Sequence, residues 1–432
     1  MTSSPSALAV EDAYFASNPP PKALPEHTAL ASAFIASHAE LPHRRVVLIT
    51  SGGTTVPLEK QTVRFIDNFS AGTRGATSAE YFLEAGYAVI FLHRQFSLRP
   101  YSRHFSHSRD CFLDFLTEAQ GPGGTWQVQW REDGAGAGAG TGERDDDDDD
   151  DATTTASPKA VQVRDVLRKY RRAKDANMLL MIPFVTIGDY LHELRALSRL
   201  MSPLGRRGLL YLAAAVSDFF VPPERMAEHK IQSTDAAMTT TAVSAASSSA
   251  IAKAAAAAVA AVVGNGIPEE EEFDNFDASP RVVRSKRLVV DLDPVPKFLK
   301  NLVDGWAPQG MIVSYKLETD PAILVRKARY SLERYQHHLV IGNLLSTRKW
   351  EVVFVSPRRE DKWLRVSPVR VCKTMSMAEA GTETSHWGPD AEGRPLRAEE
   401  LPREDPDMEI ENLIVPAVAK LHDEHIAGGE SS

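Results

Sequence analysis

Cysteine is nearly absent from this chain of 432 residues, which holds only Cys111 and Cys372. So few thiols exclude a disulfide framework and favour a reducing compartment. Long apolar runs are also missing, since no stretch reaches the roughly 18 residues that cross a bilayer. Residues 1–9 lack the basic, apolar and small-residue succession of a signal peptide. We therefore expect a protein of the cytoplasm, with the nucleus as a second location, and no membrane partner.

Acidic residues outnumber basic residues, 58 to 49, which gives a formal net charge of −9 at pH 7. An acidic balance argues against a surface that coats nucleic acid, so no nucleic-acid partner is expected. Much of this charge is local. Asp145–Asp151 supplies seven negative charges and Glu269–Glu272 supplies four. The rest of the chain is therefore close to neutral.

Several catalytic signatures are missing from the sequence. It contains no GxSxG nucleophile elbow, CxxC pair, HExxH zinc motif, P-loop or GxGxxG fingerprint. Neither cysteine lies among other site-like residues, which argues against thiol catalysis, and no set of metal ligands stands out. The remaining chemistry is the binding of phosphates and carboxylates by amides, glycine, arginine and lysine. Such binding suits the nucleotide-dependent activation of an acid, where positioning and charge stabilisation carry most of the rate.

Three segments are low in complexity: 121–158, 233–285 and 374–407. The first cannot bury enough apolar surface to offset its ordering entropy. We expect disordered insertions for the first two, with a short isolated helix in the Ala-rich part of the second (Ala250–Val263) as the alternative, and an exposed loop for the third. The remaining residues fit one large α/β domain. Its predicted parts, which follow an N-terminal extension with a helix at 1–41, are 42–120, 159–232, 286–373 and 408–427.

The folded remainder alternates between strand and helix patterns. Helical spacing is found at 75–85, 191–200 and 410–422, and Gly86 is placed to end the first of these helices. Continuous apolar strands separated by helices are typical of a mostly parallel sheet covered on both faces, so we predict a three-layer, doubly wound α/β/α fold. The expected strands lie at 46–50, 87–93, 178–184, 209–214, 288–291, 311–315, 339–342 and 352–355.

In such sheets ligands bind beyond the carboxyl ends of the strands, and two polar segments lie there. Ser51–Thr54 reads SGGT, a turn whose glycines allow close approach to a phosphate, although a plain tight turn fits equally well. The segment 64–76 places Asn68, Ser70 and two arginines at the start of a helix. A helix N-terminus favours anions, so Ser70 belongs either to an anion site or to a simple helix cap.

Polar residues follow three further predicted strands. Asp218 can orient a ligand or a metal ion, or cap the next turn. Lys230 offers a cation close by, while a role for His229 stays open. Lys316, next to Tyr315, and Asn343 follow two later strands. Their shared position at strand ends predicts one anion-binding centre, to which Arg64, Arg74, Lys230 and Lys316 bring positive charge.

Five motifs in this order resemble eukaryotic phosphopantothenate–cysteine ligase, also called phosphopantothenoylcysteine synthetase. They are TSGGT from Thr50, VRFIDNFSAGTRGATSAE from Val63, LAAAVSDF from Leu212, HKIQS from His229 and KLETDP from Lys316. The resemblance covers roughly residues 42–356 apart from the insertions. It implies a Rossmann-like or ribokinase-like fold and a homodimer.

The resemblance also implies an activity, the second step of coenzyme A biosynthesis from pantothenate. A nucleoside triphosphate with Mg²⁺ activates the carboxylate of 4′-phosphopantothenate, and L-cysteine displaces the nucleotide from the acyl-nucleotide intermediate. Eukaryotic members accept ATP and bacterial members use CTP. The motifs here have the eukaryotic form, so ATP is expected. Complexes with other coenzyme A pathway proteins are a further implication.

Site residues follow from the family pattern, position by position. The resemblance implies that Asn68, Ala214, Ala215 and Asp218 hold phosphopantothenate, and that Arg64 reaches its phosphate from the neighbouring subunit. Asn68, Asp218 and Lys230 are the expected catalytic residues, with Lys230 facing the triphosphate charge. The family has phenylalanine where Tyr315 stands, which leaves stacking on the base in place. The implied nucleotide contacts are Gly52, Ser70, Gly72, Gly75, Tyr315 and Asn343.

Two other functions compete with the ligase. An NAD(P)-linked oxidoreductase shares the sheet pattern but lacks the expected GxGxxG followed by an acidic residue about 20 positions later. A regulatory or scaffold protein that keeps the fold without catalysis is the second alternative, with the acidic insertions as partner-binding segments.

Overall fold

The computed structural model describes residues 7–105, 116–120, 126–130, 158–231, 281–282, 288–368, 387 and 393–430. Its contacts divide the chain into two compact units. The small unit comprises Met1–Pro19, Thr55–Asn68 and Ser217–Pro296, and the large unit comprises Pro20–Thr54, Phe69–Val216 and Lys297–Ser432.

An eight-stranded sheet forms the centre of the large unit, in the order β16-β15-β14-β13-β8-β1-β4-β7. The strands from β14 to β7 are parallel, and β15 and β16 add an antiparallel edge. This mostly parallel sheet confirms the predicted α/β class. The bounds are β1 Val46–Ser51, β4 Ala88–Arg94, β7 Leu179–Phe184, β8 Gly208–Leu212, β13 Met311–Glu318, β14 Leu339–Leu344, β15 Glu351–Val355 and β16 Lys362–Arg365.

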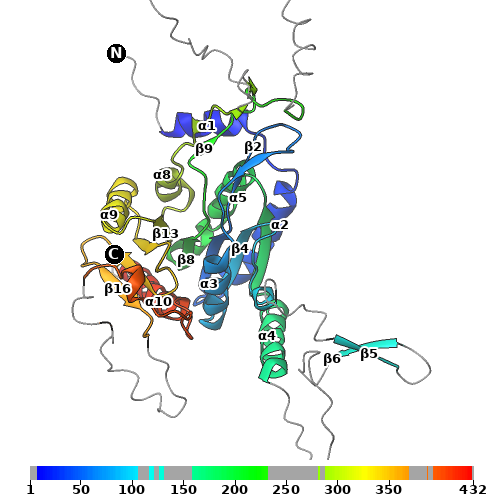
Figure 1. The fold of residues 1–432 in the computed structure, drawn as a ribbon, viewed down its shortest axis with the longest axis vertical. Helices are drawn as coiled ribbons and strands as arrows, with labels where there is room; N and C mark the ends of the chain where they lie inside the picture. The colour runs from blue at the N-terminus through cyan, green and yellow to red at the C-terminus, as the bar shows by residue number, and fades with distance from the viewer. Residues whose placement is uncertain are drawn as a thin grey trace, which may run out of the picture. The chain divides into compact units, whose positions relative to one another are not determined.

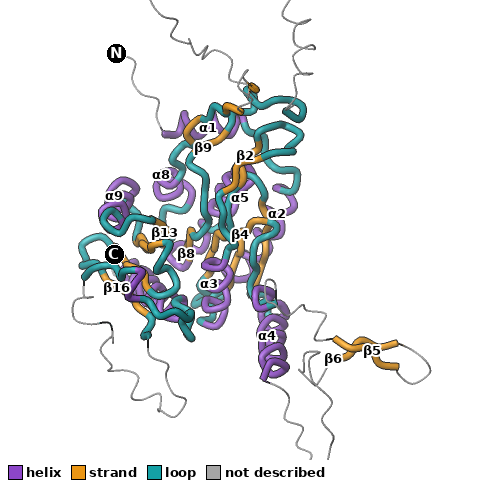
Figure 2. The backbone as a smooth tube through the Cα atoms, viewed as in Figure 1, coloured by secondary structure: helices purple, strands orange, loops and turns teal. Residues whose placement is uncertain are grey.

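Helices cover both faces of this sheet (Figures 1 and 2). On one face α3 (Thr73–Glu84) and α10 (Glu411–Glu430) lie side by side, and they share a core with alternate strand residues such as Leu339 and Ile341. Val340, which lies between these two residues on β14, packs instead against α9 (Leu324–Tyr335). Because strand side chains alternate between faces, a continuous apolar strand needs a helix on each side.

Two further helices pack against each other and against β7 in the large unit. They are α2 (Leu24–Ala39) and α5 (Ile187–Leu200). α5 begins at a capping box, in which the Asp189 backbone N–H donates to Thr186 Oγ1 at 3.1 Å and the Thr186 N–H donates to the Asp189 carboxylate at 2.9 Å.

The remaining described elements complete the large unit. They are η1 Ser102–His104, the antiparallel hairpin β5 Leu116–Gln120 and β6 Trp126–Trp130, α4 Pro158–Asp175, η3 Ser202–Arg207, α8 Leu299–Asn301, the π-helical turn η6 Leu302–Trp306, and η8 Ala398–Glu400.

Among its described residues, the small unit contains one helix and three two-stranded ladders. Its helix α1 (Ala7–Ser17) contacts β9 through the rings of Tyr14 and Phe220, whose centroids lie 5.2 Å apart. The antiparallel ladders pair β2 Thr55–Pro57 with β3 Phe65–Asp67, β9 Phe219–Phe220 with β12 Asp293–Pro294, and β10 Arg281–Val282 with β11 Leu288–Val289.

The prediction that residues 288–291 add a strand to the main sheet is wrong. Leu288 and Val289 form β11, and among the described strands this one pairs with β10 and not with the main sheet. Their side chains are 44% and 52% exposed, so this short apolar run does not cross a core. A run of so few apolar residues cannot be distinguished from a small surface ladder by its pattern alone.

The structure describes parts of all three predicted insertions. The exposed loop expected over 374–407 is contradicted by Trp387 and Leu396, which are buried in the large core. The indole N–H of Trp387 donates to the Val366 carbonyl at 3.0 Å, which anchors the ring. Within 121–158, residues 126–130 form β6, and within 233–285, residues 281–282 form β10. The rest of these two segments, apart from Pro158, which begins α4, lies outside the described residues.

Candidate functional site

The turn after β1 is a close backbone junction in the large unit. Gly52 has φ +87°, and a Cβ there would lie 2.7 Å from Arg94 Cβ, so only glycine fits. The Ala215 N–H donates to the Gly52 carbonyl at 2.8 Å, and the Thr54 N–H donates to the Ala215 carbonyl at 3.0 Å. The end of β8 is therefore joined to this turn, which brings Gly52 close to Ala215 and its neighbour Ala214.

The first turn of α3 packs on the same junction. Gly72 is its N-cap, with φ +82° and no side-chain capping bond. Its N–H donates to Ser70 Oγ at 3.3 Å, and Ser51 Oγ donates to its carbonyl at 3.0 Å. A Cβ on Gly75 would lie 2.5 Å from Ser51 Cβ, so the helix touches the strand end directly. Ser70 is thus not the helix cap, and the uncapped N-terminus points its dipole at this junction.

Tyr315 on β13 is connected to α3 through a buried polar network. Tyr211 hydroxyl lies 3.0 Å from Ser78 Oγ and also hydrogen-bonds the Tyr315 hydroxyl. Burial raises the pKa of Tyr211 to about 12 and that of Tyr315 well above its usual value, so both phenols stay neutral. The Arg74 guanidinium lies 5.9 Å from the Tyr315 ring centroid.

Arg74 has a different role from the phosphate binding predicted for it. Its Nη1 donates to Glu411 Oε1 at 2.7 Å, and its Nη2 donates to the Arg348 carbonyl at 2.6 Å. The Arg74 and Glu411 side chains are largely buried. Arg74 therefore joins the first turn of α3 to the first turn of α10, a contact between residues 337 positions apart that local sequence cannot indicate.

Asn343 and Lys316 lie on neighbouring strands. Asn343 is buried on β14 and is in register with Leu317 of β13. The Lys316 ammonium lies 3.5 Å from the Glu318 carboxylate, which Lys327 also approaches at 3.1 Å. Lys316 is thus an ion-paired residue. All six residues predicted to contact the nucleotide lie in the large unit: Gly52, Ser70, Gly72, Gly75, Tyr315 and Asn343.

The other predicted site residues lie in the small unit. Asn68 directly follows β3, and Asp218, whose carbonyl accepts the Val295 N–H at 2.8 Å, precedes β9. Both Asp218 and Lys230 are exposed. Arg64 Nη1 donates to Glu59 Oε1 at 2.9 Å and to the Ile231 carbonyl at 2.8 Å, so the arginine is held by its own unit.

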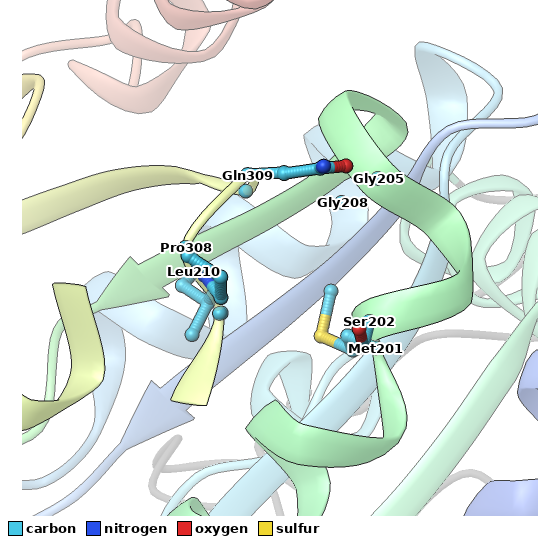
Figure 3. A pocket seen from close by; sticks show the side chains of 9 residues that line it. Met201, Ser202, Gly205, Gly208, Leu210, Pro308 and Gln309 are labelled. Carbon is cyan, nitrogen blue, oxygen red and sulfur yellow. The ribbon is translucent and has the colours of Figure 1, made fainter. Parts of the chain in front are cut away.

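A cavity of ≈ 160 Å³ lies within the large unit, at the amino ends of β8 and β13 (Figure 3). The side chain of Gln309 reaches across it towards Gly205. No charged residue lines it. Since ligands of such sheets bind at the carboxyl ends of the strands, we assign it no part in the site. Its lining is Met201, Ser202, Gly205, Gly208, Leu210, Ala307, Pro308, Gln309 and Gly310.

Two features of the region were missed by the sequence analysis. Glu59, which holds Arg64, is fully buried although glutamate is usually a surface residue. Phe69 is 95% exposed and Phe96 86% exposed, and their loops are neighbours, because the Leu98 N–H donates to the Ala71 carbonyl at 2.9 Å. A phenylalanine among polar site residues is the only signal that could have indicated Phe69.

Comparisons with known proteins agree on one family. Residues 43–106 match the family model described as DNA/pantothenate metabolism flavoprotein C-terminal domain. The chain is 42% identical over 358 residues to phosphopantothenate–cysteine ligase CAB2 of Saccharomyces cerevisiae, covering 82% of this chain and 80% of the relative. It is 38% identical over 322 residues to human phosphopantothenate–cysteine ligase, covering 74% of this chain and 79% of that protein.

A solved structure agrees as well. The structure of a Cab2 histidine-to-alanine mutant in complex with phosphopantothenate-cysteine superimposes with a TM-score of 0.66 at 36% identity. The match covers 97% of this chain and 99% of that chain.

Proposed function

The chain belongs to the phosphopantothenate–cysteine ligase family, and we propose that it joins 4′-phosphopantothenate to L-cysteine by an amide bond in coenzyme A biosynthesis. The observation that carries this proposal is the match, over 97% of the chain, to a structure that contains phosphopantothenate-cysteine. The junction of Gly52, Gly72 and Gly75 supports it, because uncapped N–H groups and close backbone approach suit a phosphate.

The proposed reaction has two steps. An oxygen of the phosphopantothenate carboxylate attacks the α-phosphorus of a nucleoside triphosphate, a P–O bond breaks and pyrophosphate leaves. The amine of L-cysteine then attacks the acyl carbon, the C–N bond forms, and the C–O bond to the nucleoside monophosphate breaks with loss of an amine proton. Positioning and charge stabilisation carry such reactions.

The chain's residues divide these tasks. Gly52, Ser70, Gly72 and Gly75 bind the triphosphate at the N-terminus of α3, and Tyr315 and Asn343 contact the base or ribose. Asn68 and Asp218 orient the phosphopantothenate, for which the small side chains of Ala214 and Ala215 leave room. Lys230 balances triphosphate charge. We propose ATP as the nucleotide, supported by the eukaryotic form of the motifs and by relatives from yeast and human.

Mg²⁺ is the proposed metal. Among the residues that the structure describes, no group of three or more His, Cys, Asp and Glu side chains could hold an ion. Mg²⁺ fits this observation, because it usually takes one or two carboxylates together with substrate phosphates. The exposed carboxylate of Asp218 is the candidate protein ligand, and the bound ion would neutralise charge on the triphosphate.

A homodimer is proposed in which Arg64 reaches the phosphopantothenate of the neighbouring subunit. Support comes from the residues beside it, since Val63, Phe65 and Ile66 are 52%, 50% and 38% exposed. Apolar side chains that flank a functional arginine are expected to be covered by a partner. Location in the cytoplasm or nucleus, and complexes with other coenzyme A pathway proteins, stay predictions; none of the described helices is long and apolar enough to cross a bilayer.

The activity is tested by mass spectrometry of reactions that contain 4′-phosphopantothenate, L-cysteine, MgCl₂ and either ATP or CTP. We expect phosphopantothenoylcysteine only when all components are present, with a higher initial rate for ATP. A folded protein that makes no product with either nucleotide would disprove the ligase. A higher rate with CTP would disprove the nucleotide assignment alone.

The shared site is tested by mixing two inactive variants, Arg64→Ala and Asn68→Ala. If a site takes Arg64 from one subunit and Asn68 from the other, mixed dimers contain one intact site. Activity of up to about a quarter of wild type is then expected, since half of randomly assorted dimers are mixed and half of their sites are intact. No recovery in mixtures shown to exchange subunits would contradict the shared site.

A further inference from the structure

Glu59 is a fully buried carboxylate that receives four N–H groups in the small unit. Its Oε2 accepts the backbone N–H groups of Val63 at 3.1 Å and Arg64 at 2.8 Å. Its Oε1 accepts Arg64 Nη1 at 2.9 Å and the Ile231 N–H at 3.3 Å. Burial alone would raise the pKa of Glu59, but these donors lower it below its usual value, so the carboxylate is charged.

The bond to Glu59 leaves one side of the Arg64 guanidinium available. Both hydrogens of Nη1 are used, one by Glu59 Oε1 and one by the Ile231 carbonyl at 2.8 Å. Within the described part of the chain, Nε and Nη2 have no hydrogen-bond partner, and the side chain is 35% exposed. Two parallel N–H donors on one edge are the geometry with which arginine binds a phosphate at two oxygens.

Glu59 also connects two separate segments. The Lys60 N–H donates to the Ala227 carbonyl at 3.0 Å, and Glu59 itself forms a β-bridge with Ala227. With its bond to the Ile231 N–H, the carboxylate lies between the loop that carries Arg64 and the segment that carries Lys230. Removing its charge would leave several donors without an acceptor, which allows both segments to move.

We propose that Glu59 is a positioning residue that fixes the free edge of Arg64 for the phosphate group of phosphopantothenate. This inference rests on the proposed function, because that function supplies the phosphate. Glu59 does not touch the substrate. It orients the guanidinium through Nη1, so its effect depends on the presence of both Arg64 and the phosphate group.

Equilibrium binding to the intact protein tests this role independently of turnover. Calorimetry gives the Kd of 4′-phosphopantothenate and of pantothenate, which lacks the phosphate. Glu59→Gln should weaken phosphopantothenate binding roughly tenfold, by loss of one well-placed bidentate contact, and leave pantothenate binding unchanged. In the Arg64→Ala background, Glu59→Gln should have no further effect on either Kd.

Glu228→Gln is the matched control. Glu228 joins the same two segments through Lys60 at 2.8 Å, but that pair is exposed, so both Kd values should stay within twofold of wild type. If Glu59→Gln does not fold, Glu59→Asp keeps the charge while moving it by one methylene. It should weaken phosphopantothenate binding severalfold, again only when Arg64 is present.

Three results would overturn the proposal. They are equal weakening of both ligands, an effect of Glu59→Gln that persists in the Arg64→Ala background, and unchanged phosphopantothenate binding in both Glu59 variants. The first two would assign Glu59 a purely structural role. Failure of the ligase proposal would appear separately, as wild-type protein that binds phosphopantothenate but makes no product.

Discussion

Gly75 shows how closely the backbone of α3 approaches the end of β1. A Cβ at this position would lie 2.5 Å from both Cβ and Oγ of Ser51, which real structures do not allow. The contact places the N–H groups at the start of α3 beside the Gly52 turn. Packing alone thus requires small residues at this point of the motif, apart from any role in the proposed nucleotide binding.

Gly75→Ala should therefore impair nucleotide binding. The added methyl group displaces Ser51 or the first turn of α3, at a cost of roughly 1–3 kcal/mol in the free energy of unfolding. We expect the KM for the nucleotide to rise at least tenfold, measured by initial rates, with a parallel loss of stability in urea unfolding.

Gly305→Ala is the control for this prediction. No heavy atom lies within 4 Å of a Cβ at Gly305, so stability should not fall and the KM for the nucleotide should not rise. If Gly75→Ala behaves like Gly305→Ala, the junction described for Gly75 is not the nucleotide site.

At the level of elements, the position of α10 depends on a buried ion pair. Arg74 of α3 and Glu411 of α10 are joined at 2.7 Å, and their side chains are 16% and 7% exposed. Removing one partner of a buried pair leaves an uncompensated charge, which costs far more than breaking a surface pair.

Glu411→Gln should lower the free energy of unfolding by about 3 kcal/mol, measured by urea denaturation. The control is Asp405→Asn, which breaks the exposed pair of Asp405 with Lys349 and should cost less than about 1 kcal/mol. Equal losses in the two variants would contradict a structural role for the Arg74–Glu411 pair.

Local patterns predicted some elements well and others poorly. The strands at Val46–Ser51 and Ala88–Arg94 were predicted within a residue or two, because each apolar run has strand length and a glycine at one end, which favours a buried strand. Glu59 could not be predicted to hold Arg64 and Ile231 together, since the second contact spans 172 positions. Trp387 was placed in a loop because its neighbours are polar, yet its indole is buried in the large core.

The candidate site was predicted as a set of residues but not as a set of contacts. Glycine motifs indicated the junction around Gly52 and Gly72, because their backbone requirement is local. The bonds of Arg74 to Glu411 and of Lys316 to Glu318 were not foreseen, since a cation in a polar loop can serve a ligand or the fold equally well.

For the whole molecule, three histidines with lowered pKa values predict an acid-sensitive fold. Burial lowers the pKa values of His337, His338 and His422 to about 4 each. In the unfolded chain histidine takes up its proton near pH 6.5, so the unfolded state binds more protons between pH 6.5 and 4. Stability is therefore present above pH 6.5 and is lost as the pH falls towards 4.

We expect the free energy of unfolding to drop between pH 7 and pH 5 by roughly 2 kcal/mol for each of these histidines. His337→Gln should reduce the drop by about that amount, because glutamine does not titrate. Urea unfolding at both pH values measures this, and an unchanged drop in His337→Gln would show that His337 is not neutral in the fold.

We propose that the chain activates the phosphopantothenate carboxylate with a nucleotide before cysteine attacks. The most direct test supplies 4′-phosphopantothenate labelled with ¹⁸O in its carboxylate, together with ATP, Mg²⁺ and L-cysteine, and follows the label by mass spectrometry. We predict one ¹⁸O atom in AMP for every phosphopantothenoylcysteine formed, with unlabelled pyrophosphate. Label in inorganic phosphate, or amide product with unlabelled AMP, would contradict the acyl-nucleotide route, and the absence of product would contradict the ligase itself.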